Sequence, residues 1–219
     1  MTGGYAGAHA LFKPVHWDGA YLMGMARIGL EDVELERRIG INGYRRNHTG
    51  KWTGLTGSAL AGAGKDWNRD YSGGRLAYGP LGWLEYAVAH RGSLTESGAG
   101  ASRLHVDSDT VSAFSSVLGA HVSYARKADR GTALQWDAMA AWRHQWQNET
   151  LHTSASFAGY GDTGFSSASE FTGRNSLLAQ LGIKVTDTKG RYARLSAGGE
   201  WYGSGTTSTF ASVQLGMAF

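Results

Sequence analysis

The fold class is decided by the stretch Phe210-Ala211-Ser212-Val213-Gln214-Leu215-Gly216-Met217-Ala218-Phe219. In its second half, large apolar side chains stand at every second position, with small or polar side chains between them. A period of two is the pattern of a β-strand that has one apolar face. The apolar face of this strand consists of Val213, Leu215, Met217 and Phe219.

The same alternation recurs about ten times along the chain, with Gly, Ser, Asp or Asn between the segments. Successive antiparallel strands joined by turns produce this pattern. Besides the last segment, we expect strands over residues 18–30, 52–64, 81–91, 111–124, 133–146, 151–161, 177–185 and 193–201. A chain of 219 residues is long enough for one all-β domain. The sequence therefore predicts a single antiparallel domain over residues 1–219.

Composition narrows the possible classes of protein. Cysteine is absent, which excludes a disulfide framework and a Cys-ligated metal site. The net charge of +3 comes from scattered Lys and Arg, so the sequence favours no nucleic-acid partner. No run approaches the ~20 consecutive apolar residues of a membrane-spanning helix. If the chain spans a membrane, we expect it to do so as a closed up-and-down β-barrel.

Alternation alone does not say whether the apolar face meets lipid or a dry core. Three features favour lipid: the segments are long, small polar residues fill the other face, and aromatic residues stand near the segment ends. Ten residues at a rise of ~3.3 Å, tilted by ~40°, span the ~25 Å between the two aromatic girdles of an outer-membrane barrel. The expected girdle residues are Trp136, Trp142, Trp146 and Trp201.

The opposite, inward face carries charges of both signs on different strands. These expected lumen-lining residues are Arg27, Glu85, His121, Asp137, Arg143, Lys184, Arg194 and Glu200. Two interpretations stay open: the charges hydrate the lumen and hold a segment that passes through it, or they form ion pairs that only stiffen the wall.

The connections predict which rim is which. Residues 31–51 form the most charged stretch, and together with 66–77 and 161–174 we expect them to be long loops on one rim. Short turns at residues 129–131 and 187–190 are expected on the opposite, periplasmic rim.

No motif supports catalysis or a cofactor. The glycine pattern Gly159-Tyr160-Gly161-Asp162-Thr163-Gly164 lacks the following helix of a dinucleotide site, and Ala63-Gly64-Lys65-Asp66 lacks two elements of a phosphate-binding loop. The eight histidines show no metal-ligand spacing. We therefore expect no catalytic residues, no metal and no cofactor.

Several short motifs, in this order, resemble the C-terminal β-domain of the autotransporters, the translocators of type V secretion. They are Gly79-Pro80-Leu81-Gly82-Trp83-Leu84-Glu85-Tyr86, Leu94-Thr95-Glu96-Ser97-Gly98-Ala99, Ser116-Val117-Leu118-Gly119, Trp142-Arg143-His144, the Phe157 and Phe165 pair, the Gly182 strand and the final Phe219. The resemblance implies a monomeric 12-stranded barrel in the bacterial outer membrane. Its lumen would hold a helical linker to an N-terminal passenger, and the barrel-assembly machinery would be a partner.

What the resemblance implies for single residues is limited to two groups. Glu85 stands inside the family-like run and is the first choice for a residue that acts in the lumen. The terminal apolar set from Val213 to Phe219 would be the membrane-insertion signal, as in outer-membrane proteins generally.

The sequence departs from the family at its amino end. Neither the linker helix nor the first two strands are recognisable, and residues 1–5 do not start a signal peptide. We therefore expect an N-terminally incomplete barrel. The alternatives are an outer-membrane pore or adhesin, a barrel-type surface hydrolase and, last, a soluble all-β carbohydrate-binding domain.

The face assignment of the last strand leads to a first prediction. We expect Leu215→Arg to reduce assembly into the membrane more than Gln214→Arg, because only the first places a charge against lipid. The cost of Arg on a lipid-facing position is ~2–4 kcal/mol at the midplane and falls toward the interfaces. The amount of heat-modifiable protein in outer membranes measures assembly, and equal amounts of both variants would contradict the assignment.

Overall fold

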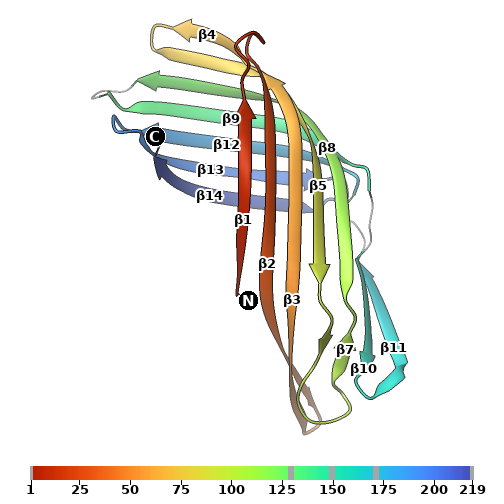
Figure 1. The fold of residues 1–219 in the computed structure, drawn as a ribbon. Coiled ribbons are helices and arrows are strands. Elements are labelled where there is room, and N and C mark those ends of the chain that lie inside the picture. The colour runs from red at the N-terminus through yellow and green to blue at the C-terminus, as the bar shows by residue number, and fades with distance from the viewer. Residues whose placement is uncertain (1, 128–130, 148–150, 170–172, 218–219) are drawn as a thin grey trace.

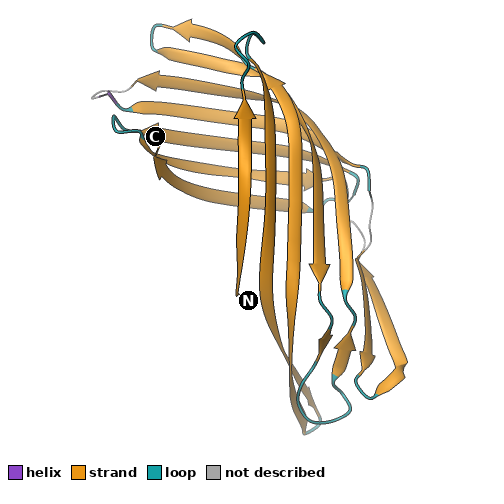
Figure 2. Ribbon diagram, viewed as in Figure 1, coloured by secondary structure: helices purple, strands orange, loops and turns teal. Residues whose placement is uncertain are grey.

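The computed structural model describes residues 2–127, 131–147, 151–169 and 173–217. Phe219, the last residue of the expected insertion signal, lies outside this set. The described chain is almost entirely strand, as the ribbon in Figure 2 shows. The strands are β1 (Thr2–Phe12), β2 (Ala20–Ile41), β3 (Tyr44–Lys65), β4 (Trp67–Tyr71), β5 (Gly74–Arg91), β6 (Leu94–Thr95), β7 (Leu104–Val106), β8 (Asp109–Lys127), β9 (Ala133–Gln145), β10 (Leu151–Phe157), β11 (Tyr160–Ser169), β12 (Asn175–Thr186), β13 (Arg191–Tyr202) and β14 (Thr207–Met217).

The main sheet is antiparallel throughout and runs in the order β1-β2-β3-β5-β8-β9-β12-β13-β14. β4 continues β3, because Gly64 pairs with Leu81 and Trp67 with Tyr78 in one register along β5. The prediction of an all-β antiparallel fold with about ten strands is therefore confirmed. Thr2–Phe12 is a wall strand that the sequence pattern did not indicate.

The sheet curls strongly along its length. Figure 1 shows β9, β12, β13 and β14 turned behind β1, β2 and β3, so that one face is concave and the other convex. Within the described residues, β1 and β14 are the two edges and do not pair with each other. The described residues thus form an open half-barrel, where the sequence predicts an up-and-down barrel that is incomplete at its amino end.

The convex face carries the apolar positions of the strands. Leu118, Leu181 and Leu215 are 62%, 66% and 78% exposed, and each belongs to the apolar half of its alternating strand. The fully buried apolar side chain on the opposite face is Val117 of β8. A soluble protein that used this sheet as one layer would bury the large apolar side chains of the first group.

The two rims of the sheet differ in their connections. On the short-turn rim lie residues 13–19, 72–73 and 187–190, together with the link between β8 and β9, where most of the turn expected over 129–131 falls outside the described residues. On the long-loop rim lie residues 42–43, 92–108 and 203–206, together with the described parts of the connection between β9 and β12. Bacterial barrels have short turns on the periplasmic side and longer loops outside.

The structure corrects three expectations about connections. Residues 66–77 are not a long loop but the end of the β3–β4 strand and the start of β5, on the short-turn rim. Residues 31–51 are not a loop either, because β2 and β3 continue as one hairpin beyond the wall. Residues 151–161 do not form a wall strand: β10 and β11 (Tyr160–Ser169) belong to a separate sheet, β11-β10-β7-β6, on the long-loop rim.

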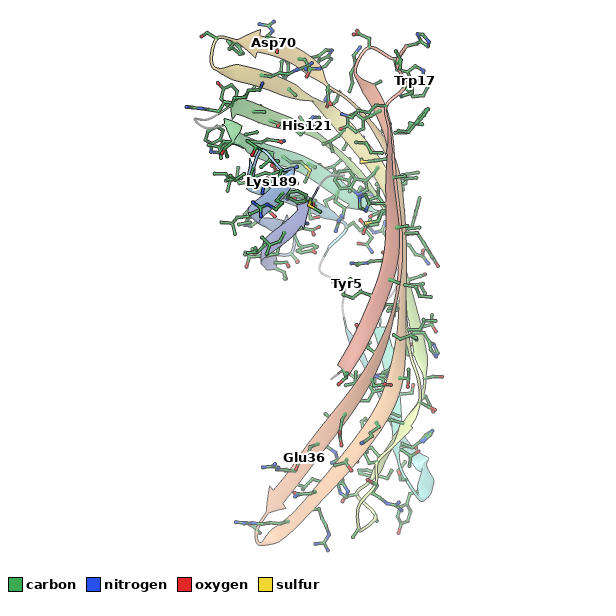
Figure 3. The ribbon with its side chains drawn as sticks, turned by 60° about the vertical axis from the view of Figure 1, so that its left-hand side comes forward. Tyr5, Trp17, Glu36, Asp70, His121 and Lys189 are labelled. Atoms are coloured by element: carbon green, nitrogen blue, oxygen red, sulfur yellow. The ribbon has the colours of Figure 1, made fainter. Side chains whose placement is uncertain are left out.

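The long hairpin closes on Asn42-Gly43, whose φ angles of 44° and 85° are both left-handed. Such a two-residue turn matches the twist of its strands, and Asn-Gly is its preferred sequence. Figure 3 shows Glu36 on this hairpin, at the opposite end of the molecule from Trp17 and Asp70.

No helix among the described residues is long and apolar enough to cross a membrane.

Candidate functional site

The concave face gathers three of the expected lumen residues into one cluster. Arg143 donates from Nη1 to both carboxylate oxygens of Glu200 at 3.1 Å, and from Nη2 to Glu85 Oε2 at 3.3 Å. Ser176 Oγ donates to Glu200 Oε1. All three charged side chains are mostly buried. A guanidinium between two carboxylates leaves this cluster with one negative charge.

The geometry of the sheet explains why these residues meet. Glu85, Arg143 and Glu200 lie on β5, β9 and β13, and one strand separates each from the next. Two strands with one strand between them lie ~9.6 Å from each other. Long side chains close that distance on the concave face, toward which they converge. The sequence places the three residues on inward positions but does not show that they pair.

A second pair crosses β12 in the same way. Arg194 Nη2 of β13 donates to Asp137 Oδ2 of β9 at 2.7 Å. Gly182 of β12 pairs with Asp137 and leaves room for its carboxylate, because a Cβ at this position would lie 2.6 Å from Asp137 Oδ2. The glycine is therefore required by the close approach of the ion pair.

His121 belongs to a third cluster, nearer the short-turn rim. Its Nε2 lies 2.9 Å from Asp66 Oδ1, and Lys13 Nζ donates to Asp66 Oδ2 at 3.0 Å. Asp66 stands where β3 passes into β4, and its backbone N–H donates to the Gly19 carbonyl. Sequence reasoning missed Asp66 and Lys13, because the pattern predicts that the strand ends at Gly64 and that a loop follows.

The remaining two expected lumen residues lie apart from these clusters. Arg27 Nε donates to Ser58 Oγ on the neighbouring strand at 2.9 Å. Lys184 Nζ lies 4.4 Å from the centre of the Tyr192 ring, a distance at which a cation and an aromatic face attract each other.

The hollow in front of the second and third clusters has a volume of about 770 Å³. Gln135, Gln180 and Arg75 line it together with His121, Asp137 and Arg194. Hydrogen-bond donors and acceptors, and charges of both signs, thus face this open hollow. Such a surface suits a hydrated polypeptide better than a small apolar ligand.

The four expected girdle residues all lie on the convex face and are partly exposed. Trp142 and Trp201 flank Leu177 in one register row. Trp136 stacks on Tyr124 near the short-turn rim, with ring centres 6.0 Å apart, and Trp67 contacts Tyr78 at the same rim. Trp146 follows the opposite end of β9. The aromatic residues therefore form two levels, as in a barrel wall.

A buried cluster on the long-loop rim was missed by sequence reasoning. Glu96, only 2% exposed, accepts hydrogen bonds from Arg37 Nε at 2.8 Å, from Arg37 Nη2 and from the Leu104 N–H. Arg37 also donates to the Ser102 carbonyl, and the fully buried His48 has Nε2 2.9 Å from Ser102 Oγ. This outer clasp (Arg37, His48, Glu96, Ser102) holds residues 94–104 against the long hairpin.

Two arginine-paired carboxyls of the hairpin region, Glu96 and Glu36, differ in their surroundings. Hydrogen bonds from Arg37 lower the pKa of Glu96, against the opposing effect of burial. Hydrogen bonds from Arg38 also lower the pKa of Glu36, but Glu36 is exposed. Only the Glu96 pair joins two separate segments of the chain.

Among the described residues, no three His, Asp or Glu side chains come together in a way that could hold a metal ion.

A family model described as Autotransporter beta-domain matches residues 1–198. No curated protein matches the chain.

The Gly182 contact leads to a prediction. We expect Gly182→Val to push the Asp137 carboxylate away from Arg194 and to lower stability by ~1 kcal/mol, the scale of a partly exposed ion pair. The temperature at which the folded band disappears in gel electrophoresis measures this loss. Gly40→Val is the control, because nothing lies within 4 Å of a Cβ there. If Asp137→Ala and Gly182→Val were fully additive, the proposed coupling would be wrong.

The lowered pKa of Glu96 leads to a prediction about the stability of the outer clasp at neutral pH, where Glu96 is ionised. Because the folded pKa of Glu96 is lowered, its stabilising effect is complete above the ordinary glutamate pKa of about 4.3 and is lost as the pH falls through the lowered value. We expect Glu96→Gln to raise trypsin cleavage after Arg103 at neutral pH about tenfold, which corresponds to ~1.4 kcal/mol and lies near the lower end for hydrogen bonds to charged groups. Glu36→Gln is the matched control and should leave cleavage unchanged; equal cleavage of both variants would refute the clasp.

Proposed function

Since this chain belongs to the Autotransporter beta-domain family, we propose that it helps to export a passenger segment of its own protein through the outer membrane and then anchors it there. Family membership places the chain among the outer-membrane translocators of type V secretion. The identity of the exported segment is not encoded in these residues. No catalytic role is proposed for any of them.

The observation that supports this proposal most directly is the inverted distribution of side chains. Leucines and tryptophans cover the convex face, while ion pairs and hydroxyls cover the concave face. An apolar outer band with a polar interior is the arrangement of an outer-membrane barrel. It would be unstable as the surface and core of a soluble sandwich.

We propose that further strands complete the wall between β1 and β14. Both edges present unpaired backbone N–H and C=O groups, which cannot stay unpaired in lipid. The family resemblance implies twelve strands, against the nine that follow one another along the described sheet. Three added strands would close it and widen the lumen.

The lumen clusters are proposed to bind the passing segment. The Glu85–Arg143–Glu200 cluster and the Asp137–Arg194 pair offer charged donors and acceptors to a polypeptide backbone. Their second possible role, stiffening of the wall, uses the same bonds. An experiment has to separate an effect on transport from an effect on stability.

Two surface roles belong to the same proposal. Val213, Leu215 and Met217 are exposed on the convex face of β14, the edge strand, where the barrel-assembly machinery would read them. The two aromatic levels that contain Trp136, Trp142, Trp146 and Trp201 would lie at the membrane interfaces.

The test uses the full-length protein with a protease-sensitive reporter inserted upstream of the complete barrel, and export is measured as digestion of the reporter on intact cells. We expect Glu85→Gln, which leaves the Arg143–Glu200 pair in place, to slow export severalfold while the melting temperature of the folded band changes little. A drop in melting temperature with normal export would instead assign the cluster to wall stiffening. Lys189→Gln, exposed in a turn of the short-turn rim, is the control for a general effect of charge. A wild-type reporter that stays protected in intact cells would refute the proposed export.

A further inference from the structure

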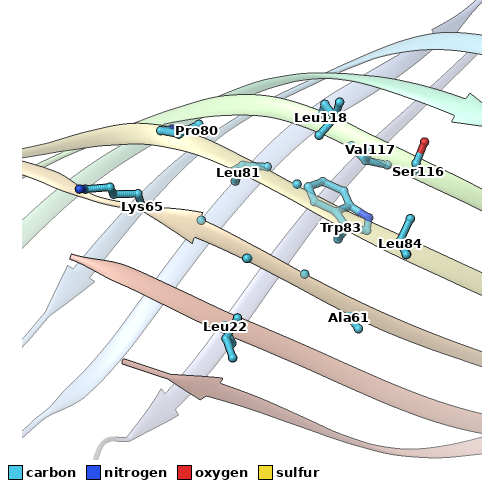
Figure 4. Close-up of a pocket in the computed structure, with 14 residues that line it drawn as sticks. Leu22, Ala61, Lys65, Pro80, Leu81, Trp83, Leu84, Ser116, Val117 and Leu118 are labelled. Carbon is cyan, nitrogen blue, oxygen red and sulfur yellow. The ribbon is translucent and has the colours of Figure 1, made fainter. Parts of the chain in front are cut away.

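The convex face has a groove, and Figure 4 draws the residues that line it. One register row reads Leu22, Ala63, Gly82 and Leu118 across β2, β3, β5 and β8. Two small residues thus stand between two leucines, and Leu118 leans over Gly82, with its Cδ2 2.8 Å from the Cβ that this glycine lacks. Below them, Ala61 extends the floor and Leu84 forms the end of one wall. The hollow has a volume of about 730 Å³.

The groove has a defined depth in the proposed membrane. Its upper end lies at Lys65 and Pro80, one row from Trp67 and Tyr78 at the short-turn rim. Its lower end lies at Leu84 and Ser116. Aromatic residues of a barrel wall lie at the level of the lipid headgroups. The groove therefore runs from the headgroup level of the periplasmic leaflet into the hydrocarbon.

The two ends of the groove differ in chemistry. The floor and walls are apolar, but Lys65 supplies a cation at the headgroup level. The Lys65 side chain is 38% exposed, and its Nζ lies 3.7 Å from an oxygen of Asp18, whose side chain is fully exposed. A solvent-exposed ion pair of this length is weak, so an anion in the groove can compete with Asp18 for the ammonium group.

We propose that this groove holds one acyl chain of an anionic glycerophospholipid of the periplasmic leaflet, with Lys65 binding its phosphate. The occupant must be apolar along its length and anionic at the end near the rim. An amphiphile of this kind meets both requirements. The inference rests on the outer-membrane placement that belongs to the proposed function.

The experiment uses the full-length protein, purified in detergent and examined by native mass spectrometry. The probes are dioleoyl phosphatidylglycerol and dioleoyl phosphatidylcholine, which have the same chains but different headgroups. We expect Ala63→Leu, which fills the floor, to reduce bound phosphatidylglycerol at least fivefold. Ala179→Leu, on the convex face of β12 outside the groove, is its matched control and should leave binding unchanged.

The headgroup assignment has its own test. We expect Lys65→Gln to reduce bound phosphatidylglycerol about threefold or more and to remove its preference over phosphatidylcholine, whereas Lys189→Gln leaves both unchanged. Retention of the heat-modifiable band identifies variants that fold, and Ala61→Leu replaces Ala63→Leu if that variant does not. Equal binding by the groove variant and Ala179→Leu would overturn the proposal, as would an unchanged headgroup preference in Lys65→Gln.

The failure of this inference is distinguishable from failure of the proposed function. A protein that exports its reporter and requires detergent, but binds both lipids equally in all variants, would refute the lipid site alone. A protein that stays dispersed without detergent would refute the membrane placement, and with it both proposals.

Discussion

Backbone hydrogen bonding in lipid is the constraint on which this structure depends. Lipid offers no partner to an N–H or C=O group, so each wall strand must pair along its whole length. Unbroken registers are seen between β1 and β2 and between β13 and β14, with eleven pairs each, while the outer edges of β1 and β14 stay open within the described residues. Full pairing makes side chains alternate strictly between the two faces, and this alternation lets one face meet lipid while the other stays polar.

The curvature of the sheet brings polar side chains of the concave face close enough to form ion pairs. Residues on alternate strands, such as Asp137 and Arg194, reach each other because the strand between them presents a glycine on the concave side. The clusters link β5, β9 and β13, and so connect strands that share no backbone hydrogen bonds. The same bonds that join the wall laterally also line the path proposed for the exported segment. An effect of these side chains on wall stability therefore has to be measured separately from an effect on transport.

Beyond the long-loop rim, the chain is held together by different means. β2 and β3 continue as a hairpin with polar residues on its strands, and β6, β7, β10 and β11 form a second small sheet. In this region a largely buried ion pair, Arg37–Glu96, connects residues 94–104 to the long hairpin. The exposed Arg38–Glu36 pair, two residues apart on one strand, joins nothing. Burial and separation along the chain, rather than charge itself, decide which pair contributes to the architecture.

The sequence by itself determined the fold class, the family and the two faces of the wall strands, because alternation such as that over residues 177–185 is a local property that any pairing must respect. It did not reveal Thr2–Phe12 as a strand, since glycine and alanine hide the alternation there. It also did not separate residues 151–157 from the wall, because the alternation within a strand does not determine which other strand it pairs with. Only the tertiary structure decided that Arg143 meets Glu85 and Glu200, that Asp66 meets His121 and that Glu96 meets Arg37. These contacts depend on sheet curvature and loop packing, which arise from the whole chain and from no single stretch of it.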